Sequence, residues 1–293
     1  MQLSKTDMDL FYKLWFALLA YVNTQYQTIQ IEGITPAELR RMTVKALGLL
    51  REALYQHPDV ISSYVADNPD QFNEEELAII REWRFFIYDD FILLRQLKTH
   101  AIFLDRHEPP LAYGVLSLGA TFEDLVALPA MLNTVLLPFK GRIIYDGFFG
   151  YSPVTFSRSI RDSFNDAYQR AKSMHGLITS LPFKPQDDKD VDAEMLRFFV
   201  KSAGNREQYC DAIDDLLRKT PALLPLYHQE IGKHNVRTFK QRLREQGVAP
   251  AWFAVLDGML LACGKTRDEV VQNIAWLLPR EKQDYVHIFQ WKN

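Results

Sequence analysis

The chain has too few cysteines, glycines and prolines for several classes of protein. Its 293 residues include two cysteines, Cys210 and Cys263, which are too few for a disulfide framework and form no CxxC pair. With 13 glycines and 14 prolines, the composition is neither fibrous nor of low complexity. Low cysteine content without a disulfide pattern is typical of a reducing compartment, so we expect a cytoplasmic protein.

Long apolar runs and an excess of basic charge are also missing. The N-terminal residues MQLSKTDMD carry one lysine against two aspartates, and the apolar run that follows is short and contains Lys13. This segment predicts a core helix rather than a signal peptide or a membrane span, so we expect no membrane partner. The net charge of −3, from 34 basic and 37 acidic residues, excludes a basic field over the whole molecule but leaves local basic patches open.

What the sequence does contain is an α+β pattern. Residues 1–88 show apolar positions at helical spacing, with helix starts at Thr35-Pro36-Ala37-Glu38 and at Asn73, which precedes three glutamates. Beyond residue 90 the segments become short and rich in β-forming residues, and turn residues bound them. These predicted strands are 91–98, 99–105, 111–118, 131–137 and 142–149.

The connections between most of these strands are too short for helical crossovers, which favours antiparallel pairing. We therefore expect a small, mainly antiparallel β-sheet in the centre of the chain, covered by a helix over 157–180. The helical N-terminal region, the sheet and its covering helix together form a predicted domain over 1–182.

A segment of about 181–192 is the predicted linker, because it combines two prolines with an acidic run and loses apolar periodicity. A mainly helical C-terminal module over 193–293 follows it. Its expected helices are 193–203, 206–219, 234–246, 250–263 and 266–278, and the tail DYVHIFQW alternates like a short strand.

Complete catalytic and metal-binding motifs are absent from the sequence: it holds no HExxH, CxxC pair or GxSxG. The one enzymatic constellation that we can assemble uses Asp105, Glu108 and Asp146, near the ends of predicted strands. Converging carboxylates bind divalent metals for phosphodiester cleavage. The same residues also fit polar turns or a bulge. We assign no resident metal and no cofactor.

Two local groups of basic residues are candidate binding sites. Lys140, Arg142, Arg158 and Arg161 lie around the predicted sheet and the start of its covering helix. Lys233, Arg237, Lys240 and Arg244 follow the spacing i, i+4, i+7, i+11 and therefore share one helical face. Such a face can bind phosphates or an acidic partner, although an ordinary solvated face has the same pattern.

Three hypotheses about function follow. The first is a non-enzymatic interaction or regulatory protein that acts through protein–protein contacts, since catalytic motifs are lacking and aromatic residues are abundant. The second is a nucleic-acid-binding protein that uses the basic groups at 140–161 and 233–244. The third is a metal-dependent phosphodiester hydrolase. Clustering of the basic residues on one exposed surface favours the second hypothesis, and convergence of the three carboxylates favours the third.

Overall fold

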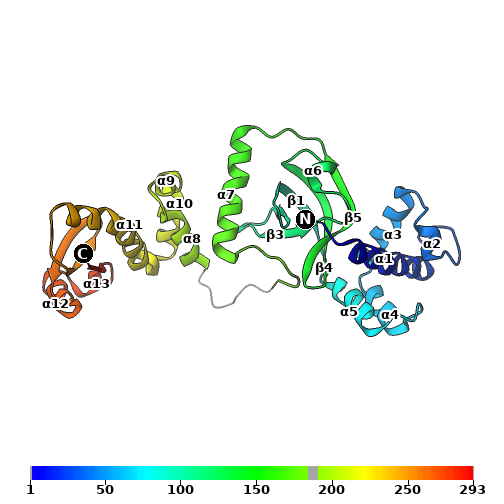
Figure 1. The fold of residues 1–293 in the computed structure, drawn as a ribbon, viewed down its shortest axis with the longest axis horizontal. Helices are drawn as coiled ribbons and strands as arrows, with labels where there is room; N and C mark the ends of the chain where they lie inside the picture. The colour runs from blue at the N-terminus through cyan, green and yellow to red at the C-terminus, as the bar shows by residue number, and fades with distance from the viewer. Residues whose placement is uncertain (1, 184–190, 293) are drawn as a thin grey trace. The chain divides into compact units, whose positions relative to one another are not determined.

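The computed structural model describes residues 2–183 and 191–292, and the chain forms two compact units, Met1–Pro185 and Gln186–Asn293 (Figure 1). The boundary between the units lies within the predicted linker 181–192, of which residues 184–190 are outside the described residues. The predicted α+β class is confirmed, because each unit combines helices with a β-sheet.

The first part of unit 1 is helical, as the sequence predicts. Its elements are α1 (Lys5–Tyr26), α2 (Pro36–Leu39), α3 (Val44–Gln56), α4 (Asp59–Asp67), α5 (Glu74–Glu82) and the 3-10 helix η1 (Trp83–Phe85). Both predicted helix starts are capping boxes, in which Thr35 pairs with Glu38 and Asn73 pairs with Glu76. In each box the cap side chain and the glutamate satisfy amides that the first helical turn leaves unpaired.

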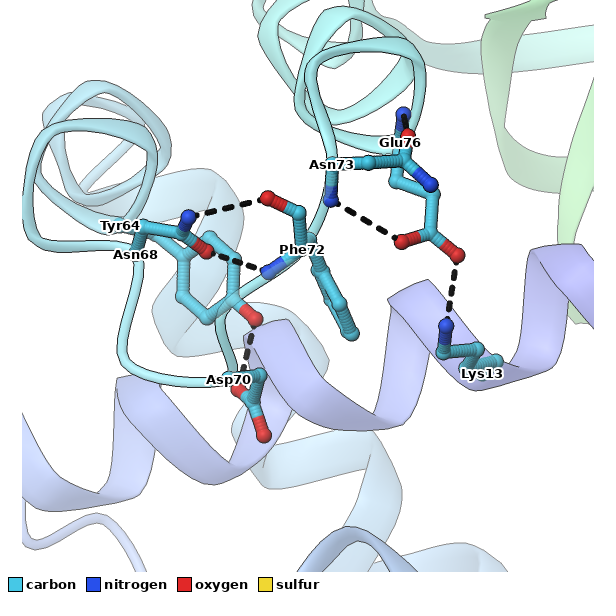
Figure 2. A network of polar contacts seen from close by, with 7 residues as sticks. All are labelled: Lys13, Tyr64, Asn68, Asp70, Phe72, Asn73 and Glu76. Carbon is cyan, nitrogen blue, oxygen red and sulfur yellow. Dashed lines mark hydrogen bonds and ion pairs between the residues drawn. The ribbon is translucent and has the colours of Figure 1, made fainter.

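Polar contacts order the turn between α4 and α5 and join α5 to α1 (Figure 2). The Asn68 side chain donates to the Phe72 carbonyl at 3.0 Å and accepts from the Phe72 amide at 2.7 Å. Glu76, besides capping α5, accepts from Lys13 Nζ on α1 at 2.6 Å. These contacts fix the direction in which the chain enters α5.

An aromatic cluster joins the helices to the sheet of unit 1. The rings of Phe11, Trp15 and Trp83 lie 5.8 Å apart in each pair, and Phe139 contacts Phe11 at 6.2 Å between ring centroids. Both tryptophans are almost fully buried. Since α1, η1 and the strand that carries Phe139 all contribute rings, the cluster holds three parts of the chain that are distant in sequence.

Five strands close into a barrel in the order β1-β2-β3-β5-β4. They are β1 (Ile87–Gln96), β2 (Ala101–Leu104), β3 (Ala112–Leu116), β4 (Ala130–Phe139) and β5 (Arg142–Ser152). Antiparallel pairing, predicted from the short connections, joins all neighbours except β3 and β5, which are parallel. The short helix α6 (Phe122–Leu125) lies between β3 and β4, and its buried Phe122 packs between Phe103 and Tyr145.

Helix α7 (Arg158–His175) lies beside the barrel (Figure 1). Tyr168 and Ala171 of α7 pack on Ile102, Leu104 and Ala112 of β2 and β3. The predicted helix over the sheet is thus confirmed.

Unit 2 begins with helices and continues into a second, smaller sheet. The helices are α8 (Val191–Val200), α9 (Ala203–Gln208), α10 (Cys210–Lys219), the 3-10 helix η2 (Pro221–Leu223), α11 (Leu224–Glu245), α12 (Arg267–Leu277) and α13 (Arg280–Gln283). The strands β6 (Ala251–Leu256), β7 (Met259–Gly264) and β8 (His287–Trp291) form an antiparallel sheet in the order β7-β6-β8. Across residues 2–183 and 191–292, no helix has the length and apolar character to cross a bilayer.

The predicted helix over 250–263 is wrong, because this segment is the β6–β7 hairpin. Its turn residues Asp257 and Gly258 both have positive φ, 48° and 81°. A two-residue Asp-Gly turn of this type matches the twist of the flanking strands and is a strong hairpin signature. The predicted C-terminal strand is confirmed as β8, and the C-terminal module, which is mainly helical over its described residues as predicted, also carries a three-stranded sheet.

The outer edge of β7 is partly occupied by α12. Asn273 Nδ2 donates to the Cys263 carbonyl at 3.3 Å, and Glu269 accepts from the Lys265 amide at 2.8 Å. The β6–β7 register also shifts between Ala254 and Val255, which interrupts the regular ladder. At the beginning of β7 the side chains of Met259 and Leu260 are exposed.

Replacing Trp83 with alanine is expected to lower the free energy of unfolding of unit 1 by about 3–5 kcal/mol, the usual range for a buried tryptophan. The matched control is Trp276→Ala, because Trp276 is 86% exposed and its loss should change stability by less than about 0.5 kcal/mol. Urea denaturation followed by circular dichroism measures both variants. Equal stability of Trp83→Ala and the parent would contradict the packing described above.

Candidate nucleic-acid interface

Helix α11 is oriented by an apolar stripe that packs on the second sheet. Val236, Phe239 and Leu243 lie against a cluster that contains Phe253, Val255, Phe289 and Trp291. The helix ends where Gly247 adopts φ 65°, a conformation that glycine tolerates and that stops α11 after Glu245. Because the stripe faces the sheet, the helical period fixes which other residues face solvent.

A close approach of the α11 backbone at Gly232 to the side chain of His287 sets the distance of α11 from β8. A Cβ atom at Gly232 would lie 2.5 Å from Cβ of His287, closer than real Cβ atoms approach one another. Any other residue at 232 would therefore displace the helix from the strand. Glycine here allows α11 to lie directly on β8.

The flank of α11 beside this stripe carries the four predicted basic residues. Lys233, Arg237 and Arg244 are exposed, and Lys240 is half-buried. Lys233 forms an ion pair with Glu230, with 2.6 Å between Nζ and Oε1. Within the described part of the chain, Arg237, Lys240 and Arg244 have no ion pair with a carboxylate. The structure thus brings all four cations to one surface, and three of them lack an acidic partner there.

Two of these cations lie against aromatic rings of β8. Lys240 Nζ is 5.9 Å from the centroid of Phe289, and the Arg244 guanidinium carbon is 5.8 Å from that of Trp291. Contacts of this kind are weakly attractive at exposed sites. They hold the stems of both side chains beside the strand, so the charged groups gather on the flank of the helix.

An open hollow of about 760 Å³ lies along this flank. It is lined by Lys233, Val236, Arg237, Lys240, Gln241, Arg244 and Glu245. All of these belong to α11, so the hollow is a surface that follows the helix rather than an enclosed cavity. Such a surface suits an elongated ligand better than a small molecule, which usually binds in an enclosed pocket.

The other predicted basic group does not form one surface. Lys140 and Arg142 both bind Asp7 of α1, at 2.7 and 2.9 Å, and these two contacts lower the pKa of Asp7 to about 2. Arg158 and Arg161 lie at the start of α7, beyond the far end of β5. With about 3.3 Å per strand residue, the 11-residue β5 separates the two pairs.

The predicted carboxylates also have separate surroundings. Asp105 is buried and accepts from the Leu111 amide at 2.8 Å, and its other oxygen lies 3.3 Å from His107 Nδ1. Glu108 pairs with Arg170 of α7 at 2.5 Å. Among the described residues, no three His, Cys, Asp or Glu side chains are placed to hold a metal ion. The structure does not bring Asp105, Glu108 and Asp146 together.

Asp146 of β5 is fully buried against α3. Its Oδ2 accepts from Arg51 Nε at 2.5 Å and from the Tyr55 hydroxyl at 3.1 Å, while Oδ1 accepts from the Phe148 amide at 3.1 Å. Burial raises the pKa of Asp146 to about 6, against the lowering influence of Arg51 and the other donors. Both oxygens are engaged within the protein, which is the arrangement of a residue that joins a helix to the barrel.

A second hollow, of about 280 Å³, lies beside the network of Figure 2. Its charged lining residues are Lys13, Arg40 and Asp70. Lys13 is paired with Glu76, and Asp70 accepts from the Tyr64 hydroxyl at 2.7 Å. This hollow therefore offers mainly Arg40 to an anion, compared with three unpaired cations along α11.

Sequence reasoning missed the partners that give these residues their roles. Arg51 was detectable, because it interrupts the apolar face formed by Leu47, Leu50 and Leu54 of α3. A charge on a buried helical face needs a buried counter-charge. No comparable pattern indicated the rings of Phe289 and Trp291 beside α11.

A scan against protein-family models found no match to this chain, and searches of curated proteins and of solved structures found none either.

Asp146→Asn is expected to lower the free energy of unfolding of unit 1 by about 3–5 kcal/mol, because Arg51 would keep a buried charge without its counter-charge. The double variant Arg51→Met with Asp146→Leu removes both charges and should recover most of that loss. Chemical denaturation of the parent and both variants measures these changes. If Asp146→Asn is as stable as the parent, the ion pair does not hold α3 on the barrel.

Proposed function

We propose that the protein binds nucleic acid, and that the basic flank of α11 contacts the phosphates. One observation carries this proposal: Lys233, Arg237, Lys240 and Arg244 share one surface, and three of them lack a carboxylate partner among the described residues. Cations that are not neutralised within a protein can displace the counterions of a phosphate backbone.

The contrast between the two basic groups supports this choice of site. Lys140 and Arg142 already share the carboxylate of Asp7, so an incoming phosphate would have to compete with it. On α11, as far as the described residues show, comparable competition arises at Lys233 alone, where Glu230 is the partner. The apolar stripe of α11 is satisfied by the sheet, so folding leaves the basic flank free for a ligand.

Lys233, Arg237, Lys240 and Arg244 form a row along α11, and the length of this row fits a polymer of phosphates. Eleven residues separate Lys233 from Arg244, and at 1.5 Å per residue the row is about 16 Å long. Each strand of a duplex places one phosphate per 3.4 Å of helical axis, so the row spans about five phosphates of one strand. Four cations over that distance match a continuous backbone better than a single small anion.

The double variant Arg237→Gln with Lys240→Gln tests this function. We expect it to reduce the slope of log affinity against log salt by about 2, because each neutralised phosphate of a duplex contributes about −0.9. Glutamine keeps the helix propensity of α11, so folding should remain nearly intact. Fluorescence anisotropy of a labelled 20-base-pair duplex over 50–200 mM salt measures the slope.

The matched control is Arg280→Gln with Lys282→Gln, which removes the same charge from exposed residues of α13. It should leave the slope unchanged if contact with α11, rather than net charge, determines binding. Binding that is absent in the parent at 50 mM salt, or equal slopes for both double variants, would contradict the proposal.

A second proposal is contact with a protein partner through Trp276 on α12. This side chain is 86% exposed, and Val271 and Leu277 of the same helix are also exposed. Large exposed aromatic residues are frequent among the side chains that dominate binding energy at interfaces. No basic residue of α11 takes part in this surface, so the two proposed functions are independent.

Trp276→Ala is expected to abolish retention of such a protein partner while nucleic-acid binding stays as in the parent. Affinity isolation from the native host at two salt concentrations, with protein and nucleic acid analysed separately, measures both. A protein partner held through Trp276 should persist at high salt, because apolar contacts are not screened. Identical sets of proteins with parent and variant would rule out this role for Trp276.

A further inference from the structure

We infer that the basic flank of α11 binds duplexes in preference to single strands, and that it contacts phosphates without reading bases. The inference rests on the proposed function and names the class of nucleic acid. It follows from what the flank of α11 offers to a ligand and from which neighbouring groups are buried.

The first argument is the density of charge in the ligand. A duplex carries one negative charge per about 1.7 Å of axis and releases about 0.9 counterion per neutralised phosphate, against about 0.7 for a single strand. A site whose charged groups are mainly cations gains more from the denser polyanion. The straight row on α11 also suits a stiff backbone, which loses little conformational freedom on binding.

The second argument is the burial of the neighbouring rings. Proteins that bind single strands stack bases on exposed aromatic side chains. Phe289 and Trp291, the rings nearest to the row, are 6% and 2% exposed. Phe239 of α11 packs on the same sheet cluster. Among the residues lining the hollow there is no aromatic ring, so a single strand would keep only its weaker phosphate contacts.

The third argument concerns the polar groups that could read base edges. Amide side chains read adenine, and carboxylates accept from cytosine. The lining residues of these kinds are Gln241 and Glu245, and Gln241 Nε2 donates to Glu245 Oε1 at 3.0 Å. Lys240 and Arg244 are held against rings of β8, at the flank of the helix. Arginine and lysine can also contact guanine, but Lys233 is paired with Glu230 and two of the other cations lie against rings, which leaves Arg237 as the main candidate for such a contact among the lining residues.

The test compares four probes with the full chain: two DNA duplexes of unrelated sequence, an RNA duplex, and one DNA single strand of the same length. If all four cations contact phosphates, the duplex slope should be about −3.6, so affinity should fall about 150-fold between 50 and 200 mM salt. The single strand should bind more weakly and fall about 50-fold over the same range. The duplexes should agree with one another within about threefold.

The variant Arg237→Gln with Lys240→Gln should reduce the duplex loss to about 12-fold over this range of salt, and Arg280→Gln with Lys282→Gln should keep the parental value. Tighter binding of the single strand, or more than tenfold discrimination among the three duplexes, would overturn this inference while leaving nucleic-acid binding in place. Lack of binding to all four probes would overturn the proposed function as well. The two failures are therefore distinguishable in one experiment.

Discussion

Each apolar sheet surface of this protein has to be covered by helices, and both the position of α7 and the exposure of the basic flank of α11 are consequences of that constraint. In unit 1 the outer face of β2 and β3 is apolar, and α7 packs on it through Tyr168 and Ala171. In unit 2 the two faces of the smaller sheet contact α11 on one side and α12 on the other. The same requirement fixes the rotation of α11 and leaves its basic flank in solvent.

The pair formed by Arg51 and Asp146 shows a different solution at the junction of the helices and the barrel. Two charges are taken out of water there, and the hydroxyl of Tyr55 and the amide of Phe148 complete the hydrogen bonding of the carboxylate. An apolar contact of equal size could be as stable, so the value of the pair lies in the orientation that it imposes. An apolar α3 could rotate or slide on β5, whereas an arginine that has to meet a buried carboxylate has one position. We regard this as the reason why a charged residue occupies the apolar face of α3.

Much of the fold was predictable because its signals are local. The capping boxes at Thr35 and Asn73, the helix over the sheet, and the basic face of α11 all follow from spacing within one segment. The β6–β7 hairpin was mistaken for a helix because its strands are continuously apolar, although Asp257-Gly258 marks the turn. Closure of the barrel was not predictable, since the parallel pairing of β3 with β5 depends on residues such as Val115 and Ile143 that are distant in sequence. The partner of Asp146 lies 95 residues away, so no local pattern connects it with Arg51.

The partly occupied edge of β7 bears on the behaviour of the protein at high concentration. A closed barrel has no strand edge to offer, but an open three-stranded sheet has two, and an unpaired edge is a template for self-association. The side chains of Asn273 and Glu269 form hydrogen bonds with the Cys263 carbonyl and the Lys265 amide. The irregular β6–β7 register also shortens the flat part of β7. At the other end of β7, Met259 and Leu260 expose large apolar side chains. A charged side chain at either position would be the smallest change that improves colloidal stability.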